Sequence, residues 1–322
     1  MIQQSFISII IPVLNAQAYI GACLEALLSQ DYPKYKFEII VVDNGSSDET
    51  LSIVKKYPVK LLTKINCNIS SLRNWGAKHA KGDVFAFIDA DCIAPSNWLY
   101  EASLLLNIEN VGAVGCWYAL PQSPTNVERV WDIVTFYRRE RTGPIDWVPS
   151  GDLIIKKENF GRIHGFDEDL ITSEDVDFCQ RIIKSGKIVY SDPKIAVEHL
   201  GNPKTLKTFF LKEKWRGEGV LQNSFKNFPQ IEFNNALIFS LISLIFVIGM
   251  LLGVVVWILK GSYGMLLKSF IGLLYVPQFL TIKALINRSQ WLDFFLLLLL
   301  FTIYGVARAA SILNPKVWSK QN

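Results

Sequence analysis

One stretch of this chain limits its fold more than any other: residues 236–259 contain no charged side chain. As an α-helix, these 24 residues would be about 36 Å long, enough to cross a hydrocarbon core of about 30 Å. Two further apolar stretches follow, at 265–285 and 291–313, each carrying two charged residues. We therefore expect residues 236–322 to form a membrane region with two or three transmembrane helices.

The part of the chain before this region has the composition of a globular domain. The net charge of +4 is small, and no strand or helix interleaves basic and aromatic residues, so we expect no nucleic-acid partner. The five cysteines are scattered without a C-x-x-C pair, which favours reduced cytosolic thiols over disulfides or a zinc site. The apolar run near the start has neither a basic n-region nor a cleavage site, so it predicts a buried strand and not a signal peptide.

Five short apolar runs predict strands that are buried on both faces, because polar and apolar residues do not alternate in them. A helix is expected over 15–29, and Ser46 to Glu49 fit a capping box ahead of another helix. The alternation predicts an α/β fold with a largely parallel sheet. The predicted strands are 6–11, 37–42, 59–62, 84–88 and 111–116.

Acidic residues follow two of these strands directly. Asp43 ends the second and Asp89 ends the fourth, so the two should meet at the carboxyl edge of the sheet, where ligands bind. Asp89 and Asp91 lie two residues apart in a turn, where both could face Mg²⁺ or Mn²⁺. Such a cation neutralises charge on a leaving diphosphate. The tripeptide could also be a polar turn, but its place at a strand end favours a metal site.

Six blocks in this order resemble glycosyltransferase family 2, whose catalytic domains adopt the GT-A fold. They span about residues 6–200 and include Ile11-Pro12-Val13-Leu14-Asn15, the segment from Ile40 to Thr50, Arg73-Asn74-Trp75-Gly76-Ala77, Phe87-Ile88-Asp89-Ala90-Asp91, His164-Gly165-Phe166-Asp167-Glu168 and the segment from Glu174 to Arg181. The resemblance implies that residues 1–203 form a Rossmann-like catalytic domain, with a mixed, mostly parallel sheet flanked by helices. It also implies a hexosyltransferase that uses a nucleotide sugar, with a UDP-sugar as the expected donor.

The resemblance further implies how the donor is bound. Asp43 should hold the nucleobase, with Pro12 and Asn15 shaping its pocket, and Arg73 should lie near the donor diphosphate. A carboxylate can accept a base N–H, and a guanidinium suits phosphate oxygens. The chain departs from the family at Asn44, where many members carry a second aspartate.

Metal and catalytic roles are implied in the same way. Asp91 is the expected direct metal ligand, while Asp89 would reach the ribose or a metal-bound water. His199 ends another predicted strand and is either a further metal ligand or a structural histidine. An inverting transfer needs one base within reach of the acceptor hydroxyl, and the resemblance places it at the pair Glu174 and Asp175, with Asp175 as the base.

Acceptor contacts are expected from Trp147 and Asp152, which occupy the place of the family's acceptor-side loop. Residues 204–235 mix basic and aromatic side chains, as does a juxtamembrane segment on an anionic membrane surface. The pair Trp215-Arg216 reverses the Arg-Trp order of processive polysaccharide synthases, so we interpret it as an interfacial tryptophan beside a snorkelling arginine.

The function predicted from the sequence is a metal-dependent, inverting transfer of one sugar to a lipid-linked or glycan acceptor. The enzyme would be a multi-pass protein of the cell inner membrane, in contact with membrane lipids and with its catalytic domain in the cytoplasm. Two alternatives stay open: transfer onto polyprenyl phosphate, and a catalytically silent subunit that binds a nucleotide sugar. A glycoside hydrolase is disfavoured, because hydrolysis needs no nucleotide pocket. The sequence leaves the oligomeric state open.

Overall fold

A computed structural model describes residues 5–170, 172–225, 235–286 and 290–314. The chain divides into two compact units, each with its own packing. We call them the sheet unit, which holds residues up to 123, 135–169 and 174–202, and the helical unit, which holds residues 124–134, 170–173 and those from 203 onward.

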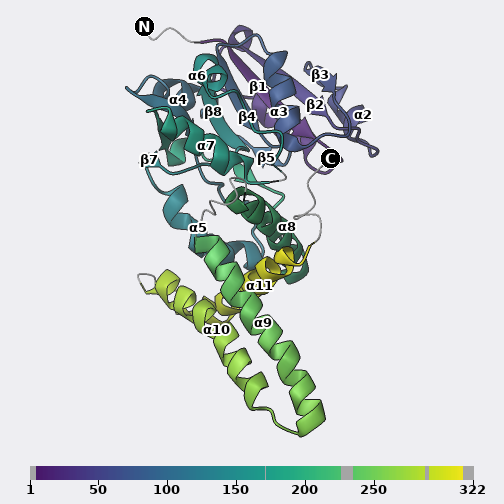
Figure 1. The fold of residues 1–322 in the computed structure, drawn as a ribbon. Coiled ribbons are helices and arrows are strands. Elements are labelled where there is room, and N and C mark those ends of the chain that lie inside the picture. Colours follow the sequence, from purple (N-terminus) through teal and green to yellow (C-terminus); the bar gives the residue numbers. More distant parts are fainter. Residues whose placement is uncertain (1–4, 171, 226–234, 287–289, 315–322) are drawn as a thin grey trace. The chain divides into compact units, whose positions relative to one another are not determined.

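An eight-stranded mixed sheet is the centre of the sheet unit (Figure 1). Its strands run in the order β3-β2-β1-β4-β8-β6-β9-β7. The four strands from β3 to β4 are parallel, whereas β8 is antiparallel to both of its neighbours, so the predicted α/β class is confirmed. The strands are β1 (Ile7–Val13), β2 (Phe37–Asp43), β3 (Lys60–Thr63), β4 (Val84–Ile88), β6 (Val111–Gly115), β7 (Gly143–Ile145), β8 (Asp152–Lys156) and β9 (Ile188–Ser191).

Helices connect these strands, and a second, two-stranded sheet pairs β5 (Cys92–Ile93) with β10 (Glu198–His199) in antiparallel register. The small sheet matters for the site, because it joins two segments that are far apart in the sequence. The helices of this part of the chain are α1 (Ile20–Leu28), α2 (Thr50–Val54), α3 (Ile69–Lys78), α4 (Trp98–Leu105), α5 (Asn126–Arg139), α6 (Lys157–Arg162) and α7 (Glu174–Lys184), with 3-10 turns at Lys34–Lys36 and Pro193–Ile195.

Two local predictions were wrong. The first helix begins at Ile20 and not at residue 15, because Asn15 adopts a left-handed conformation with φ of 51°, which a helix cannot include. The capping box ahead of α2 is absent. Instead, the carboxylate of Asp48 accepts the backbone N–H of Thr50 at 3.0 Å.

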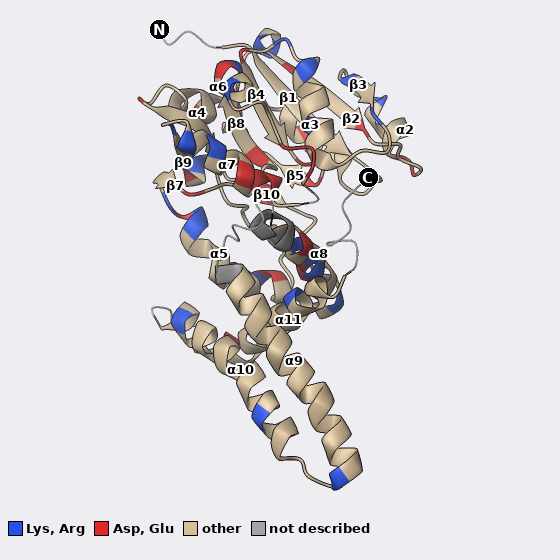
Figure 2. Cartoon of the chain, viewed as in Figure 1, with Lys and Arg blue, Asp and Glu red and all other residues tan. Residues whose placement is uncertain are grey.

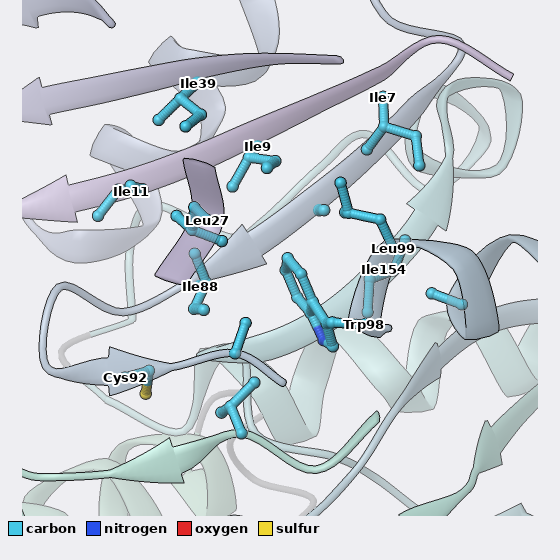
Figure 3. Packing of buried hydrophobic residues seen from close by; sticks show 14 of the residues in the cluster. Ile7, Ile9, Ile11, Leu27, Ile39, Ile88, Cys92, Trp98, Leu99 and Ile154 are labelled. Carbon is cyan, nitrogen blue, oxygen red and sulfur yellow. The ribbon is translucent and has the colours of Figure 1, made fainter. Parts of the chain in front are cut away.

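The hydrophobic core lies between the strands and the helices that cover the sheet (Figure 3). Ile9 and Ile11 of β1 pack with Leu27 of α1 and Trp98 of α4, all with no more than 1% of their surface exposed. Strands that are buried on both faces explain why their sequences are uniformly apolar. This rigid core holds the loops at the carboxyl edge of the sheet in place.

The helical unit consists mainly of α8 (Leu206–Phe225), α9 (Asn235–Lys260), α10 (Gly264–Leu285) and α11 (Phe294–Ile312), with a 3-10 turn at Trp291–Asp293. The segments 237–260, 264–285 and 291–312 are long and apolar enough to cross a membrane, judged by length and composition. Figure 2 shows these helices almost free of charged residues. All three predicted transmembrane stretches therefore form helices.

Helix α8 makes a buried contact with α11 and is not only a surface segment. Glu213 on α8 is 1% exposed and accepts hydrogen bonds from Arg308 of α11 at 2.8 Å and from Arg216 at 2.6 Å. Burial disfavours the charged carboxylate, but the two arginines hold the pKa of Glu213 below its ordinary value. A buried, charge-paired contact therefore fixes α8 against α11.

Two segments that we assigned to a catalytic domain of residues 1–203 pack within the helical unit. One is 124–134, where Trp131 contacts the rings of Phe209 and Phe301 at centroid distances of 4.7 and 5.5 Å. The other is 170–173. The sequence boundary at 203 therefore does not separate the two units.

Replacing Arg308 with methionine should destabilise the protein by about 3 kcal/mol, because it removes one of two cations that neutralise the buried Glu213. Thermal unfolding in detergent measures the loss. Arg129→Met is the matched control in the same unit. Its side chain is 44% exposed and pairs with Asp293, so we expect a change of at most about 1 kcal/mol. Equal melting curves for both variants would contradict the assigned role of Arg308.

Candidate active site

The loops after β1 and β2 interlock at the carboxyl edge of the sheet. Pro12 and Val13 pair with Val42 and Asp43 in parallel register, which brings the two loops side by side. The Asn15 amide oxygen accepts the backbone N–H of Ser47 at 2.8 Å. The predicted nucleobase residues Pro12, Asn15 and Asp43 therefore lie together.

The Asp43 carboxylate shapes its own turn. It is 1% exposed and accepts backbone N–H groups of Gly45 at 2.8 Å and of Ser46 at 3.1 Å. Gly45 has a φ of +88°, which suits glycine in this tight turn. Recognition of a nucleobase by Asp43 stays a prediction.

Arg73 lies buried between two carboxylates from distant parts of the chain. Its guanidinium contacts Asp89 at 2.7 Å and Glu174 at 2.8 Å, and its side chain is 1% exposed. Burial disfavours its charge, yet Asp89 and Glu174 raise the pKa of Arg73 above its ordinary value. Arg73 therefore orients both carboxylates, and its expected contact with a donor diphosphate stays a prediction.

Asp91 and His199 meet through the small sheet. His199 pairs with Cys92 across β5 and β10, and its Nε2 atom lies 3.6 Å from an Asp91 carboxylate oxygen. Ligand atoms of Asp91, Cys92 and His199 all lie within 4.8 Å of one another. Burial, Asp89 and Asp91 raise the pKa of the Cys92 thiol well above its usual value, so the carboxylate and the imidazole are the better ligands. The carboxylate oxygen suits Mn²⁺ or Mg²⁺, and the imidazole nitrogen suits Mn²⁺ better than Mg²⁺.

Glycines let backbone approach these carboxylates closely. A Cβ atom at Gly201 would lie 1.8 Å from Asp91 Oδ2, and one at Gly151 would lie 2.4 Å from Asp89 Oδ2. No side chain fits at such distances. Both glycines therefore help to shape the acidic cluster. Figure 2 shows acidic residues near β5, β10 and the start of α7.

Tyr118 is a site residue that the sequence reasoning missed. Its hydroxyl lies 3.4 Å from Asp89 Oδ2, and its ring lies 4.4 Å from the His199 ring. Burial raises the pKa of Tyr118 well above its ordinary value, and the negative charges of Asp89, Asp91 and Asp175 add to the shift. The signal available in the sequence was its place just after the strand 111–116, at the same sheet edge as the aspartates.

Helix α7 begins at the pair Glu174 and Asp175. Glu174 is 7% exposed, and its carboxylate accepts from Arg73 and from the Ser150 hydroxyl at 2.9 Å. Asp175 is only half-buried. Of the two expected catalytic residues, Glu174 is thus engaged by neighbouring side chains and Asp175 is the one that a substrate could reach.

The two expected acceptor residues differ in their surroundings. Asp152 has no exposed surface and accepts the Trp98 indole N–H at 2.8 Å, so it supports the fold, and its expected acceptor contact stays a prediction. Burial raises the pKa of Asp152 to about 8, although hydrogen bonds from Trp98 and from two backbone N–H groups partly oppose this increase. Trp147 is half-buried and packs against Trp117 at 4.6 Å, with the Arg138 guanidinium over both rings.

Asp152→Ala should destabilise the fold by about 2–4 kcal/mol, because the buried N–H groups of Trp98 and Cys116 lose their acceptor. Chemical denaturation of the purified protein measures the change. Asp146→Ala is the control from the same loop, since that carboxylate is 62% exposed and should cost at most about 1 kcal/mol. A direct acceptor role would instead leave stability intact and weaken acceptor binding.

Comparison with known proteins places this site in a family. Residues 8–166 match the model of glycosyl transferase family 2. Glycosyltransferase AglE of Haloferax volcanii is 29% identical over 56% of this chain and 62% of its own length. A dolichyl N-acetyl-alpha-D-glucosaminyl phosphate 3-beta-D-2,3-diacetamido-2,3-dideoxy-beta-D-glucuronosyltransferase of Methanococcus voltae is 28% identical over 59% of this chain and 65% of its own length. The match therefore spans less than two thirds of each relative.

Solved structures show the same fold. Mannosyltransferase PcManGT from Pyrobaculum calidifontis, in complex with GDP-Man and Mn²⁺, is similar over 97% of this chain and 88% of its own, with a TM-score of 0.65 and 19% identity. GalNAc-T7 with UDP, GalNAc and Mn²⁺ is similar over 70% of this chain and 51% of its own, with a TM-score of 0.52 and 16% identity. The sheet unit thus has the GT-A fold, and residues 8–166 match the glycosyl transferase family 2 model.

Proposed function

We propose that this glycosyltransferase moves one sugar from a nucleotide-diphosphate sugar to a lipid-linked acceptor, with inversion at the anomeric carbon. One observation carries the proposal: the buried Arg73 guanidinium joins Asp89 at the end of β4, at 2.7 Å, to Glu174 at the start of α7, at 2.8 Å. Asp91, two residues after Asp89, lies 3.6 Å from His199. Carboxylates gathered in this way suit a site that binds a cation and removes a proton.

The donor would bind across the interlocked loops after β1 and β2 and the turn after β4. Pro12, Asn15 and Asp43 would form the nucleoside side, and Asp89 would lie toward the ribose. The nucleotide is proposed to be UDP. Arg73 holds the Asp89 carboxylate in one orientation by a 2.7 Å ion pair, so this part of the site is organised before the donor arrives.

Asp91 and His199 would hold a divalent cation, Mn²⁺ or Mg²⁺. The cation would supply positive charge to offset the diphosphate that leaves the sugar. The chain's own contribution is to keep a carboxylate and an imidazole adjacent in a largely buried place. His199 is 6% exposed and Asp91 is 27% exposed, so the carboxylate faces the solvent side of the pair.

Asp175 is the proposed base. Its carboxylate would accept the proton of the acceptor hydroxyl, while the hydroxyl oxygen forms a bond to the anomeric carbon and the bond from that carbon to the diphosphate breaks. Attack from the face opposite the leaving group inverts the configuration. Glu174 supports this residue from the preceding position, through Arg73 and Ser150.

The acceptor is proposed to be carried by a lipid at the cytosolic membrane face. Three helices with the length and composition of transmembrane segments favour a membrane-bound substrate. The relative from Methanococcus voltae is named for a dolichyl-phosphate-linked sugar, which favours a lipid-linked sugar over bare polyprenyl phosphate. Trp147 is the proposed contact for an acceptor sugar ring.

Purified full-length protein, assayed with nucleotide sugars and a lipid-linked acceptor, should release nucleotide diphosphate and form a glycosylated lipid. Asp91→Ala and Asp175→Asn should lower the transfer rate by about 10²-fold or more. Asp177→Asn is the matched control: it lies in the same first turn of α7, pairs with Arg181 and should retain transfer. Wild-type rates in both test variants would refute the roles of Asp91 and Asp175.

Cation binding can be measured without turnover. Titration of Mn²⁺ by electron paramagnetic resonance should show one site that His199→Ala weakens and that Gly201→Ala weakens as well, because an alanine Cβ would collide with Asp91 Oδ2. Gly161→Ala, where a Cβ atom meets nothing within 4 Å, is the control. Unchanged Mn²⁺ affinity in the first two variants would exclude this ligand pair.

A further inference from the structure

Tyr118 contacts two residues that have different roles in the proposed donor site. Its ring packs against the His199 ring, at a centroid distance of 4.4 Å and an interplanar angle of 39°. Its hydroxyl lies 3.4 Å from Asp89 Oδ2. All three residues belong to the sheet unit. One side chain therefore touches both the cation side and the nucleoside side of that site.

The backbone next to Tyr118 is tied to the strand that carries His199. The Ala119 N–H donates to the Val197 carbonyl oxygen at 2.8 Å, and the His199 N–H donates to the Ala119 carbonyl oxygen at 3.4 Å. Ala119 also forms an isolated parallel bridge with Glu198. Because these contacts join the neighbours of both residues, the main chain keeps the two rings close together.

The tyrosine ring restricts how the His199 imidazole can turn. The Nε2 atom of His199 lies 3.6 Å from an Asp91 carboxylate oxygen, so a cation can bind both only if the imidazole keeps this orientation. Residues that orient a metal-binding histidine commonly change metal affinity about 10- to 100-fold when they are mutated. The Tyr118 ring therefore supports the orientation in which His199 and Asp91 face one cation.

The tyrosine hydroxyl acts on the other carboxylate. Arg73 holds Asp89 Oδ1 at 2.7 Å, and the Tyr118 hydroxyl lies beside Oδ2, so both oxygens of this carboxylate have a neighbour that can donate to them. Gly151 makes room for the second contact. A Cβ atom there would lie 2.4 Å from the Tyr118 hydroxyl oxygen and 2.4 Å from Asp89 Oδ2. Glycine at 151 thus lets the hydroxyl and the carboxylate meet.

We propose that Tyr118 is a positioning residue for the donor site, whose ring orients His199 toward Asp91 and whose hydroxyl orients Asp89. This inference rests on the proposed function, in which Asp91 and His199 hold the cation and Asp89 lies toward the ribose. Tyr118 touches neither the cation nor the donor in this scheme. It couples the two sides of the site, because any rotation of this one side chain changes both contacts.

The role of the ring is tested by Mn²⁺ binding to the full-length protein, without turnover. Wild type should bind Mn²⁺ with a pulsed electron paramagnetic resonance spectrum that shows coupling to a histidine nitrogen, and His199→Ala should lose this coupling. Tyr118→Leu should weaken Mn²⁺ binding about 10- to 100-fold and reduce the coupling, whereas Tyr118→Phe keeps the ring and should stay within about twofold of wild type. Tyr35→Leu, at a tyrosine that is 78% exposed, is the control and should change neither.

The role of the hydroxyl is tested by kinetics with a UDP-sugar and a lipid-linked acceptor. At saturating Mn²⁺, Tyr118→Phe should raise the KM for the UDP-sugar about 5-fold, because the Asp89 carboxylate loses a hydrogen-bond donor. Its kcat and its Mn²⁺ affinity should remain close to those of wild type. Damage to the fold would instead change all three quantities together.

The outcomes separate this proposal from the proposed function. Wild-type Mn²⁺ affinity and undiminished nitrogen coupling in folded Tyr118→Leu would overturn the role of the ring, as would equal losses in Tyr118→Leu and Tyr118→Phe. An unchanged KM in Tyr118→Phe would overturn the role of the hydroxyl. If Tyr118→Leu does not fold, Tyr118→Met replaces it, since methionine fills irregular space without a ring. Wild-type protein that binds no Mn²⁺, or binds it without nitrogen coupling, would overturn the proposed cation site itself.

Discussion

The site depends on one buried cation. Arg73 lies between Asp89 at the end of β4 and Glu174 at the start of α7, and pairs with both at under 3 Å. Two carboxylates held close together in a largely buried place would repel, and one of them would take up a proton. The guanidinium fork removes that repulsion and fixes both orientations at once. Every chemical role proposed for the acidic cluster depends on this neutralisation of charge by Arg73.

The structure also requires glycine at positions where a side chain would collide with a neighbour. Gly151 and Gly201 allow backbone to pass within contact distance of Asp89 and Asp91, and Gly219 does the same for Thr172. A side chain at any of these glycines would occupy space that the carboxylate or the turn fills. Main-chain packing at Gly151 and Gly201 therefore helps to hold the Asp89 and Asp91 carboxylates, in addition to the ion pair of Arg73 with Asp89.

In the apolar helical unit, too, a buried charge is paired with opposite charges. Its buried Glu213 is matched by Arg308 and Arg216, and its aromatic contacts centre on Trp131 from the segment 124–134. Two segments ahead of residue 203 thus pack with membrane-type helices: 124–134, inside the family 2 match, and 170–173, just after it.

The sequence alone determined whatever depends on local pattern. Uniformly apolar runs identified five strands, long apolar stretches identified three long helices, and strand ends marked Asp43, Asp89 and Asp91 as edge residues. Tertiary structure decided the rest, because contacts between distant segments leave no periodic signal. The fold gives the buried Arg73 and Asp152 partners inside the protein, and the pairing of β5 with β10 brings His199 to Asp91. Tyr118 and Gly219 could not be identified from the sequence, because their close neighbours come from distant segments of the chain.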